Sequence, residues 1–304
     1  MKVVVLTGGV GGARFLRGVV DVVPPADVTA IVNVGDDLEL LGVHVSPDLD
    51  SVVYALAGLA DDARGWGRAD ETWHALAAVE ELGGPTWFRL GDRDLGLHLV
   101  RTEALRTGTP LSEVTRRITL ALRIETTVLP ATDARLRTWL DTPAGELEFQ
   151  EWFVARGHRD EVDAVRYEGA AEATAAPGVL DALRAADVLV IAPSNPYVSI
   201  GPILAVHDLR AALTDRTVPC VAVSPLIDGR AVRGPADRML ARLAGGTTPA
   251  HVASCYAGLI DALVIDEADD PAGLEVEAIV TSTLMTDARS RRGVAEAALG
   301  LVAA

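Results

Sequence analysis

Four aspartates in a short stretch of the sequence have the residue type and the spacing to bind a metal ion: Asp36, Asp37, Asp48 and Asp50. The first pair follows the apolar run 31–34, which is typical of a buried strand. The second pair follows Pro47 and precedes another apolar run, so we expect it in the first turn of a helix. Four carboxylates at one sheet edge would repel one another, which favours a bound cation, and hard oxygen ligands indicate Mg²⁺ or a similar ion.

Some of these residues also have a simpler interpretation. Asp48 alone is more simply explained as the N-cap of the helix, and Asp36 and Asp37 as solvated loop charges. For the four residues together we favour the metal site.

The sequence before this stretch predicts a phosphate-binding turn. Residues 2–6 are predicted to form a strand, and TGGVGGAR at positions 7–14 leads into an amphipathic helix that runs to about Val20. Backbone amides and the helix dipole at such a turn face an anion. We therefore predict phosphate contacts from Gly11, Gly12 and Arg14, and the alternative is a tight turn with Arg14 in solvent.

Two common nucleotide-binding motifs are excluded here. The dinucleotide fingerprint fails because Arg14 stands where its third glycine belongs, and the Walker A motif fails because no lysine follows. Lys2 is the only lysine, so the chain has none for a pyridoxal Schiff base or a kinase-type phosphate contact. Any anion must be held by arginine, backbone amides or metal.

A second predicted strand-to-helix loop carries small polar side chains. Residues 188–191 form a predicted buried strand, and the proline-rich loop after it contains Ser194, Asn195 and Ser199. These side chains can hydrogen bond a phosphate or a sugar, although a rigid turn of small residues is the alternative. The next predicted strand, 218–223, leads into the loop from Ser224 to Pro235.

These elements predict an α/β fold, Rossmann-like, with a mainly parallel sheet flanked by helices. We assign residues 1–60 and 175–304 to this core and residues 61–174 to an insertion lobe that covers the active site. The lobe combines helices between 71 and 123 with a β-rich segment at 126–167, where the apolar period changes towards two. Trp66, flanked by glycines, is a candidate for stacking on a ligand.

The composition of the chain limits the kinds of partner that the protein can bind. A net charge of -16 argues against a nucleic-acid or anionic membrane surface. No apolar run reaches the length of a membrane span and the N-terminus does not resemble a signal peptide, so we expect a cytoplasmic protein. Cys220 and Cys255 lack metal-ligand spacing and are expected to be free thiols.

Several linked motifs together resemble the 2-phospho-L-lactate transferase family, nearly from end to end. They are GGVGGARF at Gly8, IVNVGDD at Ile31, PDLD at Pro47, RGWGRADETWHA at Arg64, LGDRDLGLHLVRT at Leu90, PSNPYVSIGPIL at Pro193 and SPLIDGRAVRGPADRML at Ser224. The RGWG and DETWHA motifs resemble most closely those of the actinobacterial branch of the family. One departure is Asp228, where the resemblance leads us to expect glycine.

The resemblance implies a Mg²⁺-dependent transferase of coenzyme F-420 biosynthesis. The donor would be a guanosine diphosphate ester of phospholactate or phosphoenolpyruvate, the acceptor the ribityl hydroxyl of the deazaflavin Fo, and the leaving group GMP. The sequence does not decide between the phospholactyl, phosphoenolpyruvyl and glycerate donors. The family also suggests a homodimer.

For this reaction we expect Mg²⁺ on some of the four aspartates and either Asp37 or Asp50 as the residue that orients or deprotonates the acceptor. Guanosine or its phosphates would lie near Ser194, Asn195, Ser199 and the loop from Ser224 to Gly234. Fo would lie towards Trp66, Asp92 and His98, although Asp92 is equally explained as a helix cap.

Two other functions fit parts of the pattern. A Rossmann-like NAD-dependent oxidoreductase would use Asp36 as its ribose-binding acid, but the missing third glycine and the second aspartate count against it. A non-catalytic nucleotide-binding regulator is the other alternative, and the complete PDLD and DETWHA segments favour the enzyme over it.

Overall fold

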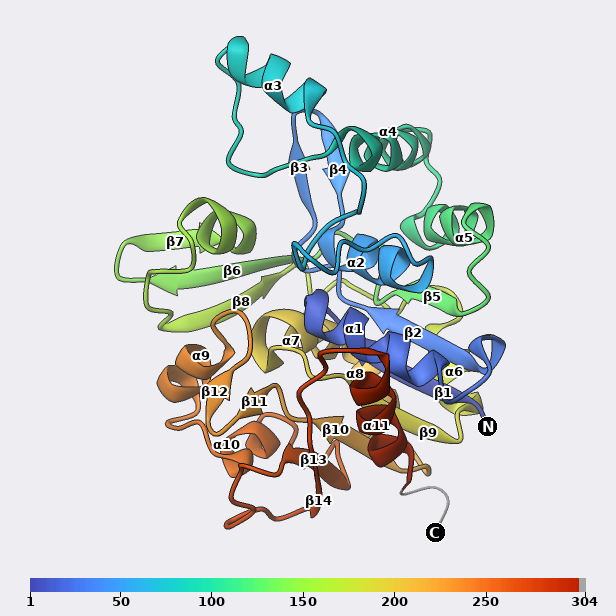
Figure 1. Ribbon diagram of the computed structural model, residues 1–304, viewed down its shortest axis with the longest axis vertical. Helices are drawn as coiled ribbons and strands as arrows, with labels where there is room; N and C mark the ends of the chain where they lie inside the picture. Colours follow the sequence, from blue (N-terminus) through green and yellow to red (C-terminus); the bar gives the residue numbers. More distant parts are fainter. Residues whose placement is uncertain (301–304) are drawn as a thin grey trace.

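The computed structural model describes residues 1–300 and is built on a seven-stranded sheet of parallel strands in the order β14-β13-β10-β9-β1-β2-β5 (Figure 1). The strands are β1 (Val3–Thr7), β2 (Val28–Val32), β5 (Thr127–Pro130), β9 (Val188–Ile191), β10 (Cys220–Val223), β13 (Ala262–Asp266) and β14 (Glu277–Thr281). Every neighbouring pair is parallel, which confirms the predicted α/β class.

The central strands form because they are short runs of β-branched and aliphatic residues that can be buried on both faces. All of β1, β9 and β10 is buried. Two groups of helices pack around this sheet: α1 (Gly9–Val20) with α2 (Pro47–Leu56) and α11 (Ala288–Leu299), and α8 (His207–Thr214) with α6 (Val179–Ala185) and α7 (Gly201–Ala205). The carboxyl ends of β1 and β2 then lie side by side, where the glycine turn and the aspartates begin.

The rest of the chain forms smaller elements around that edge (Figure 1). A hairpin of β3 (Leu38–Leu40) and β4 (Val43–Val45) projects from it, beside α3 (His74–Glu81), α4 (Asp92–Arg106) and α5 (Leu111–Ala121). An antiparallel sheet is made of β6 (Arg137–Thr142), β7 (Gly145–Glu148) and β8 (Ala164–Glu168). The remaining elements are η1 (Pro25–Asp27), η2 (Glu151–Ala155), η3 (Pro196–Ile200), β11 (Leu226–Ile227), β12 (Arg230–Ala231), α9 (Ala236–Leu243) and α10 (Pro249–Ser254).

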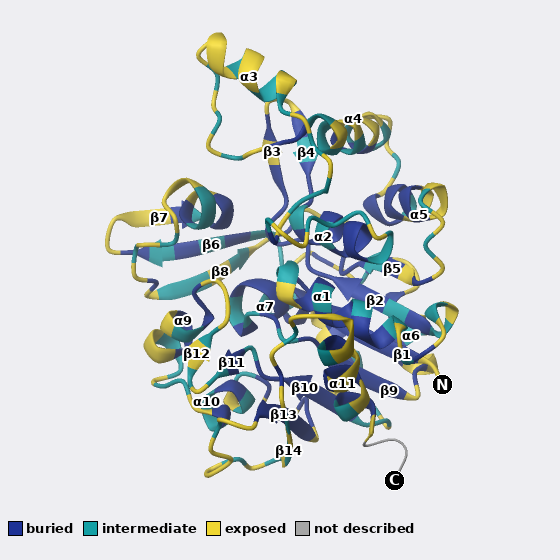
Figure 2. Cartoon of the chain, viewed as in Figure 1, coloured by how far each residue is buried: buried dark blue, intermediate teal, exposed yellow. Residues whose placement is uncertain are grey.

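The range 61–174, predicted as an insertion lobe, holds peripheral elements together with one strand of the central sheet. Its helices and its antiparallel sheet surround the edge of the core, but β5 lies within the same range and pairs in parallel with β2 of the central sheet. Trp152 is fully buried in the cluster under the antiparallel sheet, whereas α3 has no buried residue and stands out as the exposed helix of Figure 2. Among residues 1–300, no helix has the length and apolar character needed to cross a membrane.

Candidate active site

Asn33, the polar residue that follows β2, links two of the four predicted aspartates. Its side-chain amide donates hydrogen bonds to Asp36, to Asp48 Oδ2 at 2.8 Å and to the carbonyl of Val198 at 3.2 Å. Its Oδ1 accepts a hydrogen bond from the Gly35 amide at 2.7 Å, which fixes the turn after the strand. One amide therefore holds together a residue from the loop after β2 and a residue from the first turn of α2.

The four aspartates all lie at this sheet edge and all are buried: Asp36, Asp37, Asp48 and Asp50 are between 5% and 7% exposed. Burial and the charge of Asp48 raise the pKa of Asp36 well above its usual value. Burial raises the pKa of Asp48 to about 6, and the charges of Asp37 and Asp50 add to that rise. The charges of neighbouring carboxylates thus add to the effect of burial at both Asp36 and Asp48.

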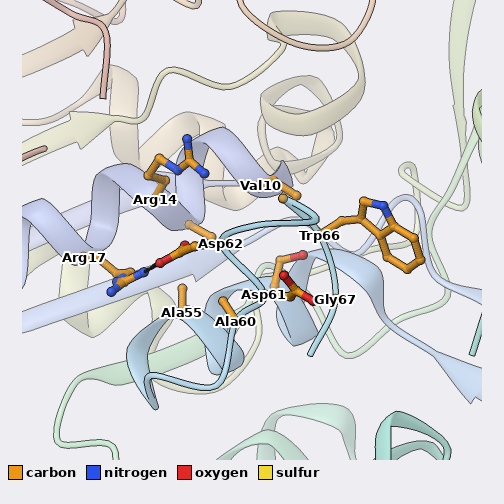
Figure 3. Close-up of a pocket in the computed structure, with 12 residues that line it drawn as sticks. Val10, Arg14, Arg17, Ala55, Ala60, Asp61, Asp62, Trp66 and Gly67 are labelled. Carbon is orange, nitrogen blue, oxygen red and sulfur yellow. Dashed lines mark hydrogen bonds and ion pairs between the residues drawn. The ribbon is translucent and has the colours of Figure 1, made fainter. Parts of the chain in front are cut away.

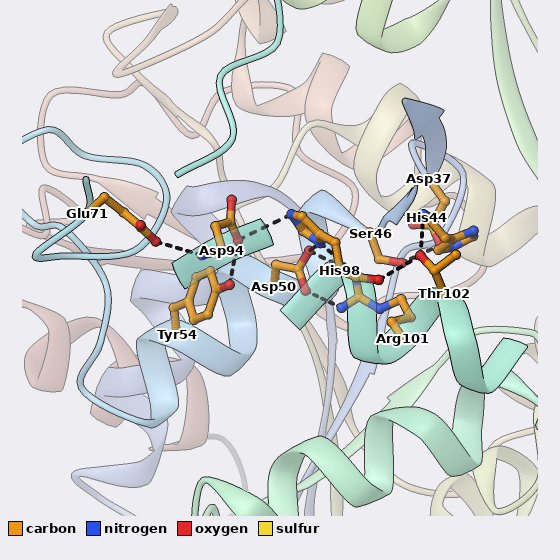
Figure 4. A network of polar contacts seen from close by, with 10 residues as sticks. All are labelled: Asp37, His44, Ser46, Asp50, Tyr54, Glu71, Asp94, His98, Arg101 and Thr102. Carbon is orange, nitrogen blue, oxygen red and sulfur yellow. Dashed lines mark hydrogen bonds and ion pairs between the residues drawn. The ribbon is translucent and has the colours of Figure 1, made fainter. Parts of the chain in front are cut away.

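Asp37 has one anchored oxygen and one oxygen without a partner. Its Oδ2 accepts a hydrogen bond from Ser46 Oγ at 2.7 Å and lies 3.0 Å from His44 Nε2 (Figure 4). Its Oδ1 is buried and has no hydrogen-bond partner among the described residues. Such an oxygen is costly to leave unsatisfied, so it is positioned to receive a metal ion or a ligand hydroxyl.

Asp50 is held differently, by a buried arginine from α4. Arg101 donates to both carboxylate oxygens of Asp50, and the arginine side chain is 2% exposed. Burial alone would lower the pKa of Arg101, but attraction to Asp50 outweighs burial and raises it. Figure 4 shows this pair at the centre of a wider network.

That network continues through His98, which is fully buried. His98 Nδ1 lies 3.7 Å from Asp50, and its Nε2 lies 3.4 Å from Asp94, which also accepts a hydrogen bond from the Tyr54 hydroxyl at 2.5 Å. The ring therefore lies between two carboxylates, one on α2 and one on α4, and its Nε2 has no hydrogen-bond partner among the described residues. These contacts fix α4 against α2.

Two sets of side chains have the chemistry to hold a divalent cation. Asp50, Asp94 and His98 each offer a ligand atom within 4.8 Å of the others, but Arg101 already supplies a positive charge there. The other set is Asp36, Asp37 and Asp48. Within residues 1–300, no arginine or histidine pairs with Asp36 or Asp48. The raised pKa values of Asp36 and Asp48 indicate carboxylates that a divalent cation would stabilise, but the ligand atoms of this second set do not all lie within 4.8 Å of one another in the described structure.

The glycine turn is packed tightly against this acidic set. Ser194 Oγ donates to the Gly8 carbonyl at 2.7 Å and accepts from the Gly8 amide at 3.4 Å. A Cβ at Gly8 would lie 2.5 Å from Asp48 Oδ2, and a Cβ at Gly12 would collide with Thr7 and lie 2.6 Å from Ser194 Oγ. Glycine is therefore required because three segments meet here without room for a side chain.

The structure places the three residues predicted to bind phosphate in two different environments. Gly11 and Gly12 lie in the first turn of α1, beside Pro193 and Ser194. Arg14 Nη1 instead donates to the carbonyl of Met285 at 3.3 Å, and Arg14 lines a small pocket with Arg17 and Trp66 (Figure 3). Phosphate binding by all three residues stays a prediction.

The residues predicted to bind the nucleotide also differ in their burial and in their hydrogen bonds. Ser194 and Ser199 are buried, and both lie against the glycine turn. Asn195 Oδ1 caps η3 by accepting from the Tyr197 amide at 2.9 Å, and Ser224 Oγ hydrogen bonds within its own turn at Leu226.

Two positions in the loop that follows Ser224 have a left-handed backbone. Gly234 has a φ of 71° and Asp228 has a φ of 50°. Asp228 thus occupies a conformation that favours glycine, the residue that the resemblance led us to expect there.

Trp66, Asp92 and His98, predicted to lie near Fo, occupy three separate environments. Trp66 lines the pocket of Figure 3, which has a volume of about 30 Å³. Asp92 accepts hydrogen bonds from the amides of His74 and Ala75, so it caps α3. Since Glu71 accepts from the amides of Arg93 and Asp94, the N-terminus of α4 is capped by Glu71 and not by Asp92.

Sequence reasoning did not assign the residues that hold the aspartates in place: Asn33, His44, Ser46, Tyr54, Asp94 and Arg101. For Asn33 a signal existed, because a single amide in an otherwise apolar strand segment has to be hydrogen bonded once it is buried. For Arg101 the sequence offered only a position one helical turn after His98.

Comparisons with known proteins agree over nearly the whole chain. The model of the family described as 2-phospho-L-lactate transferase CofD matches residues 3–292. A curated relative from Streptomyces griseus, named phosphoenolpyruvate transferase, is 43% identical over 99% of this chain and 98% of its own length. A relative with the same name from Nocardia farcinica is 43% identical over 99% of this chain and 94% of its own length.

A crystal structure of a UPF0052 family protein from Bacillus halodurans has a TM-score of 0.65 to this chain at 19% identity. The match covers 98% of this chain and 100% of that chain. At this identity the similarity establishes the shared fold alone.

Proposed function

This chain belongs to the 2-phospho-L-lactate transferase CofD family, and from that premise we propose that it is a Mg²⁺-dependent phosphoenolpyruvate or 2-phospho-L-lactate transferase of coenzyme F-420 biosynthesis. The donor is a guanosine diphosphate ester of the three-carbon acid, and the acceptor is the ribityl hydroxyl of the deazaflavin Fo. The relatives named phosphoenolpyruvate transferase favour the phosphoenolpyruvyl donor. Family membership also favours a transferase over the oxidoreductase and the regulator.

The donor's phosphates belong at the glycine turn. The first turn of α1 presents backbone amides next to two buried serines, Ser194 and Ser199, and no lysine is needed there. The guanosine would extend towards the loop after Ser224. The donor would then lie on the side of the aspartates that faces the glycine turn, where Asp48 is next to Gly8.

Asp36 and Asp48 are the residues that would hold Mg²⁺, with Asp37 beside them as the base. When bound, Mg²⁺ would neutralise donor oxygens and stabilise the charge that develops on the leaving phosphate. Asn33 keeps Asp36 and Asp48 together through its side-chain amide, so the ligand set is held before any ion arrives.

Asp37 is the residue that we assign as the general base, and its unpartnered Oδ1 carries this assignment. The acceptor hydroxyl gives its proton to Asp37 while its oxygen forms a bond to the phosphorus that carries the three-carbon unit. The bond from that phosphorus to the bridging oxygen breaks, and the electron pair leaves with GMP. Ser46 and His44 hold the other oxygen of Asp37 and thereby orient the carboxylate.

Asp50 was the second candidate for the base, and its contacts favour a supporting role. Both of its oxygens accept hydrogen bonds from Arg101, so neither is free to take a proton from a substrate without breaking a buried pair.

The test is turnover of the Asp37→Asn variant with Fo, a guanosine diphosphate ester and Mg²⁺, followed by mass spectrometry of the product. Loss of the base should lower kcat by about 10²- to 10⁴-fold. The control is Asp62→Asn, because Asp62 is an exposed aspartate paired with Arg17 and should leave kcat near the wild-type value. A kcat for Asp37→Asn within tenfold of wild type would remove Asp37 from this role, and the product mass identifies the three-carbon unit.

A further inference from the structure

The antiparallel sheet of β6, β7 and β8 contacts both loops that form the proposed site. The first, the aspartate loop (residues 33–37), follows β2, and the second, the serine loop (residues 192–200), follows β9 and leads into α7. Figure 1 shows β8 beside α7. The reaction proposed above uses no side chain of this sheet, so its contacts with the two loops call for a separate explanation.

Two neighbouring residues of the sheet make these contacts. Thr138 on β6 and Tyr167 on β8 are cross-strand partners, so their side chains lie on the same face of the sheet. The Thr138 amide donates to the Gly35 carbonyl in the aspartate loop at 2.7 Å. The Tyr167 hydroxyl donates to the Tyr197 carbonyl in the serine loop at 2.6 Å. Each of the two strands thus holds one loop.

The two loops also contact each other, with little room for adjustment. A Cβ at Gly35 would lie 2.6 Å from Thr138 Oγ1 and 2.7 Å from Pro202 at the start of α7. The side-chain amide of Asn33 donates to the Val198 carbonyl at 3.2 Å, and the same amide holds the two aspartates assigned to Mg²⁺. The serine loop therefore has to be placed accurately relative to the aspartate loop.

The Tyr167 hydroxyl has a fixed position and acts as a donor. Tyr167 packs against the main core, and burial raises the pKa of its hydroxyl, which therefore keeps its proton. A Cβ at Gly201 would collide with the hydroxyl oxygen, so glycine is required where α7 begins. The Tyr197 amide donates to Asn195 Oδ1 at 2.9 Å, so the backbone of Tyr197 is held at its amide and at its carbonyl.

Ser199 follows two residues later and lies against the glycine turn. A Cβ at Gly8 would lie 2.9 Å from the Cβ of Ser199, which shows how closely the serine loop approaches this turn. The phosphates of the donor are assigned to the same turn. Without the Tyr167 hydroxyl, the Tyr197 carbonyl would lose this bond to β8, and the serine loop could move relative to the turn.

We propose that Tyr167 is a positioning residue for the donor, because its bond to the Tyr197 carbonyl holds the serine loop against the phosphate-binding turn. The inference rests on the proposed function, in which the donor is a guanosine diphosphate ester. The aspartate loop is held separately, through the backbone amide of Thr138, and Asp37 is oriented by its own contacts. Loss of the hydroxyl therefore affects the donor and not the acceptor.

The test is Tyr167→Phe, which removes the hydroxyl and keeps the ring. Tyr256→Phe is the matched control, because Tyr256 is buried and its hydroxyl has no hydrogen-bond partner within residues 1–300. The KM for the guanosine diphosphate ester of phosphoenolpyruvate, the KM for Fo and the Kd of GDP are measured with Mg²⁺ for each variant. The temperature is kept well below the Tm of each variant, so that only folded protein is compared.

Tyr167→Phe should raise the KM for the ester and the Kd of GDP by about three- to tenfold, the factor expected for one net hydrogen bond, and leave the KM for Fo within about twofold. Tyr256→Phe should change none of the three. A merely structural hydroxyl would lower the Tm without changing these constants. Tyr167→Phe with an unchanged KM for the ester, or with equal rises in both KM values, overturns the inference.

Gly201→Ala tests the same bond from the other side, and it replaces Tyr167→Phe if that variant does not fold. Gly201 has a φ of -52°, which alanine adopts readily, but the added Cβ would displace the Tyr167 hydroxyl. Since both substitutions act on one bond, the double variant should raise the KM for the ester less than the product of the two single effects, and the full product would contradict the proposal.

The proposed function and the positioning role fail in different ways. A wild-type protein that transfers nothing from the ester to Fo refutes the proposed function. An active wild type whose Tyr167→Phe variant binds GDP and the ester equally well refutes the role of Tyr167 alone.

Discussion

Replacing Arg101 by methionine should destabilise the protein far more than the loss of a surface ion pair would. Arg101 is 2% exposed and donates to both oxygens of Asp50, which is itself buried. Methionine fills similar space but leaves the Asp50 carboxylate without its cation. Removing one partner of a buried pair costs about 3 to 5 kcal/mol, because the remaining charge stays desolvated.

For a chain of this size, such a loss corresponds to a fall in Tm on the order of 10 °C. Thermal and urea unfolding of the metal-free protein would measure it. The matched control is Arg117→Met on α5, because Arg117 is exposed and pairs with Glu113 at the surface; its Tm should stay close to that of the wild type.

A double variant separates the charge from the packing. If the unpaired Asp50 carboxylate causes the loss of stability, the double variant Asp50→Asn with Arg101→Met should be more stable than Arg101→Met alone. The double variant leaves no buried charge at this position. A loss below about 1 kcal/mol for Arg101→Met, or a double variant no more stable than the single one, would refute this account of the pair.

Two further predictions concern the acidic set and the glycine turn. Burial raises the pKa of Asp48 to about 6, above the unfolded value of about 3.9, so the folded metal-free protein binds this proton more tightly and its stability should fall as pH rises from about 4 to about 6. In thermal unfolding with a chelator, this fall should be smaller in Asp48→Asn, where the buried Asp36 is the carboxyl that still binds its proton more tightly in the folded state. Excess Mg²⁺ should stabilise the wild type more at pH 7 than at pH 5, and equal effects of Mg²⁺ at the two pH values would contradict this prediction. Gly12→Ala should lose about 1 to 3 kcal/mol, because its Cβ would meet Thr7 and Ser194. Gly96→Ala on α4, where a Cβ meets open space, should instead gain about 0.4 to 1 kcal/mol, and urea unfolding compares the two.

The parts of the fold that the sequence could predict are those with a local signal. Runs such as 188–191 are continuously apolar and short, which predicts a strand buried on both faces, and β9 is such a strand. The aspartate pairs follow such a run and a helix start, so their meeting at one edge followed from the topology of parallel sheets. No contact distant along the chain was needed for these predictions.

The partners of the aspartates could not be predicted in the same way, and α4 shows why. His98 and Arg101 are buried while Leu99 and Val100 are 54% and 65% exposed, so this part of the helix turns polar side chains inward. The usual amphipathic rule predicts the opposite orientation. The buried Asp50 on α2 helps to make the inverted orientation favourable by pairing with Arg101, and that contact is not visible from periodicity.

The hairpin between the two aspartate pairs explains how Asp37 is oriented. Gly42 and Leu41 have positive φ angles, which suits the tight turn that connects β3 and β4. Strand alternation then places Leu38, Leu40, Val43 and Val45 in one apolar cluster. Glu39 and His44, which are cross-strand partners, belong to the other face of the hairpin, and His44 contacts Asp37.

The same hairpin is tied to α4, since the backbone amide of His44 donates to Thr102 Oγ1 at 2.8 Å, next to Arg101. A shift of one residue in the pairing of β3 with β4 would turn His44 towards the apolar cluster and release Asp37. The segment between the two aspartate pairs is therefore a structural requirement of the site. Its register sets the orientation of Asp37 through the contact with His44.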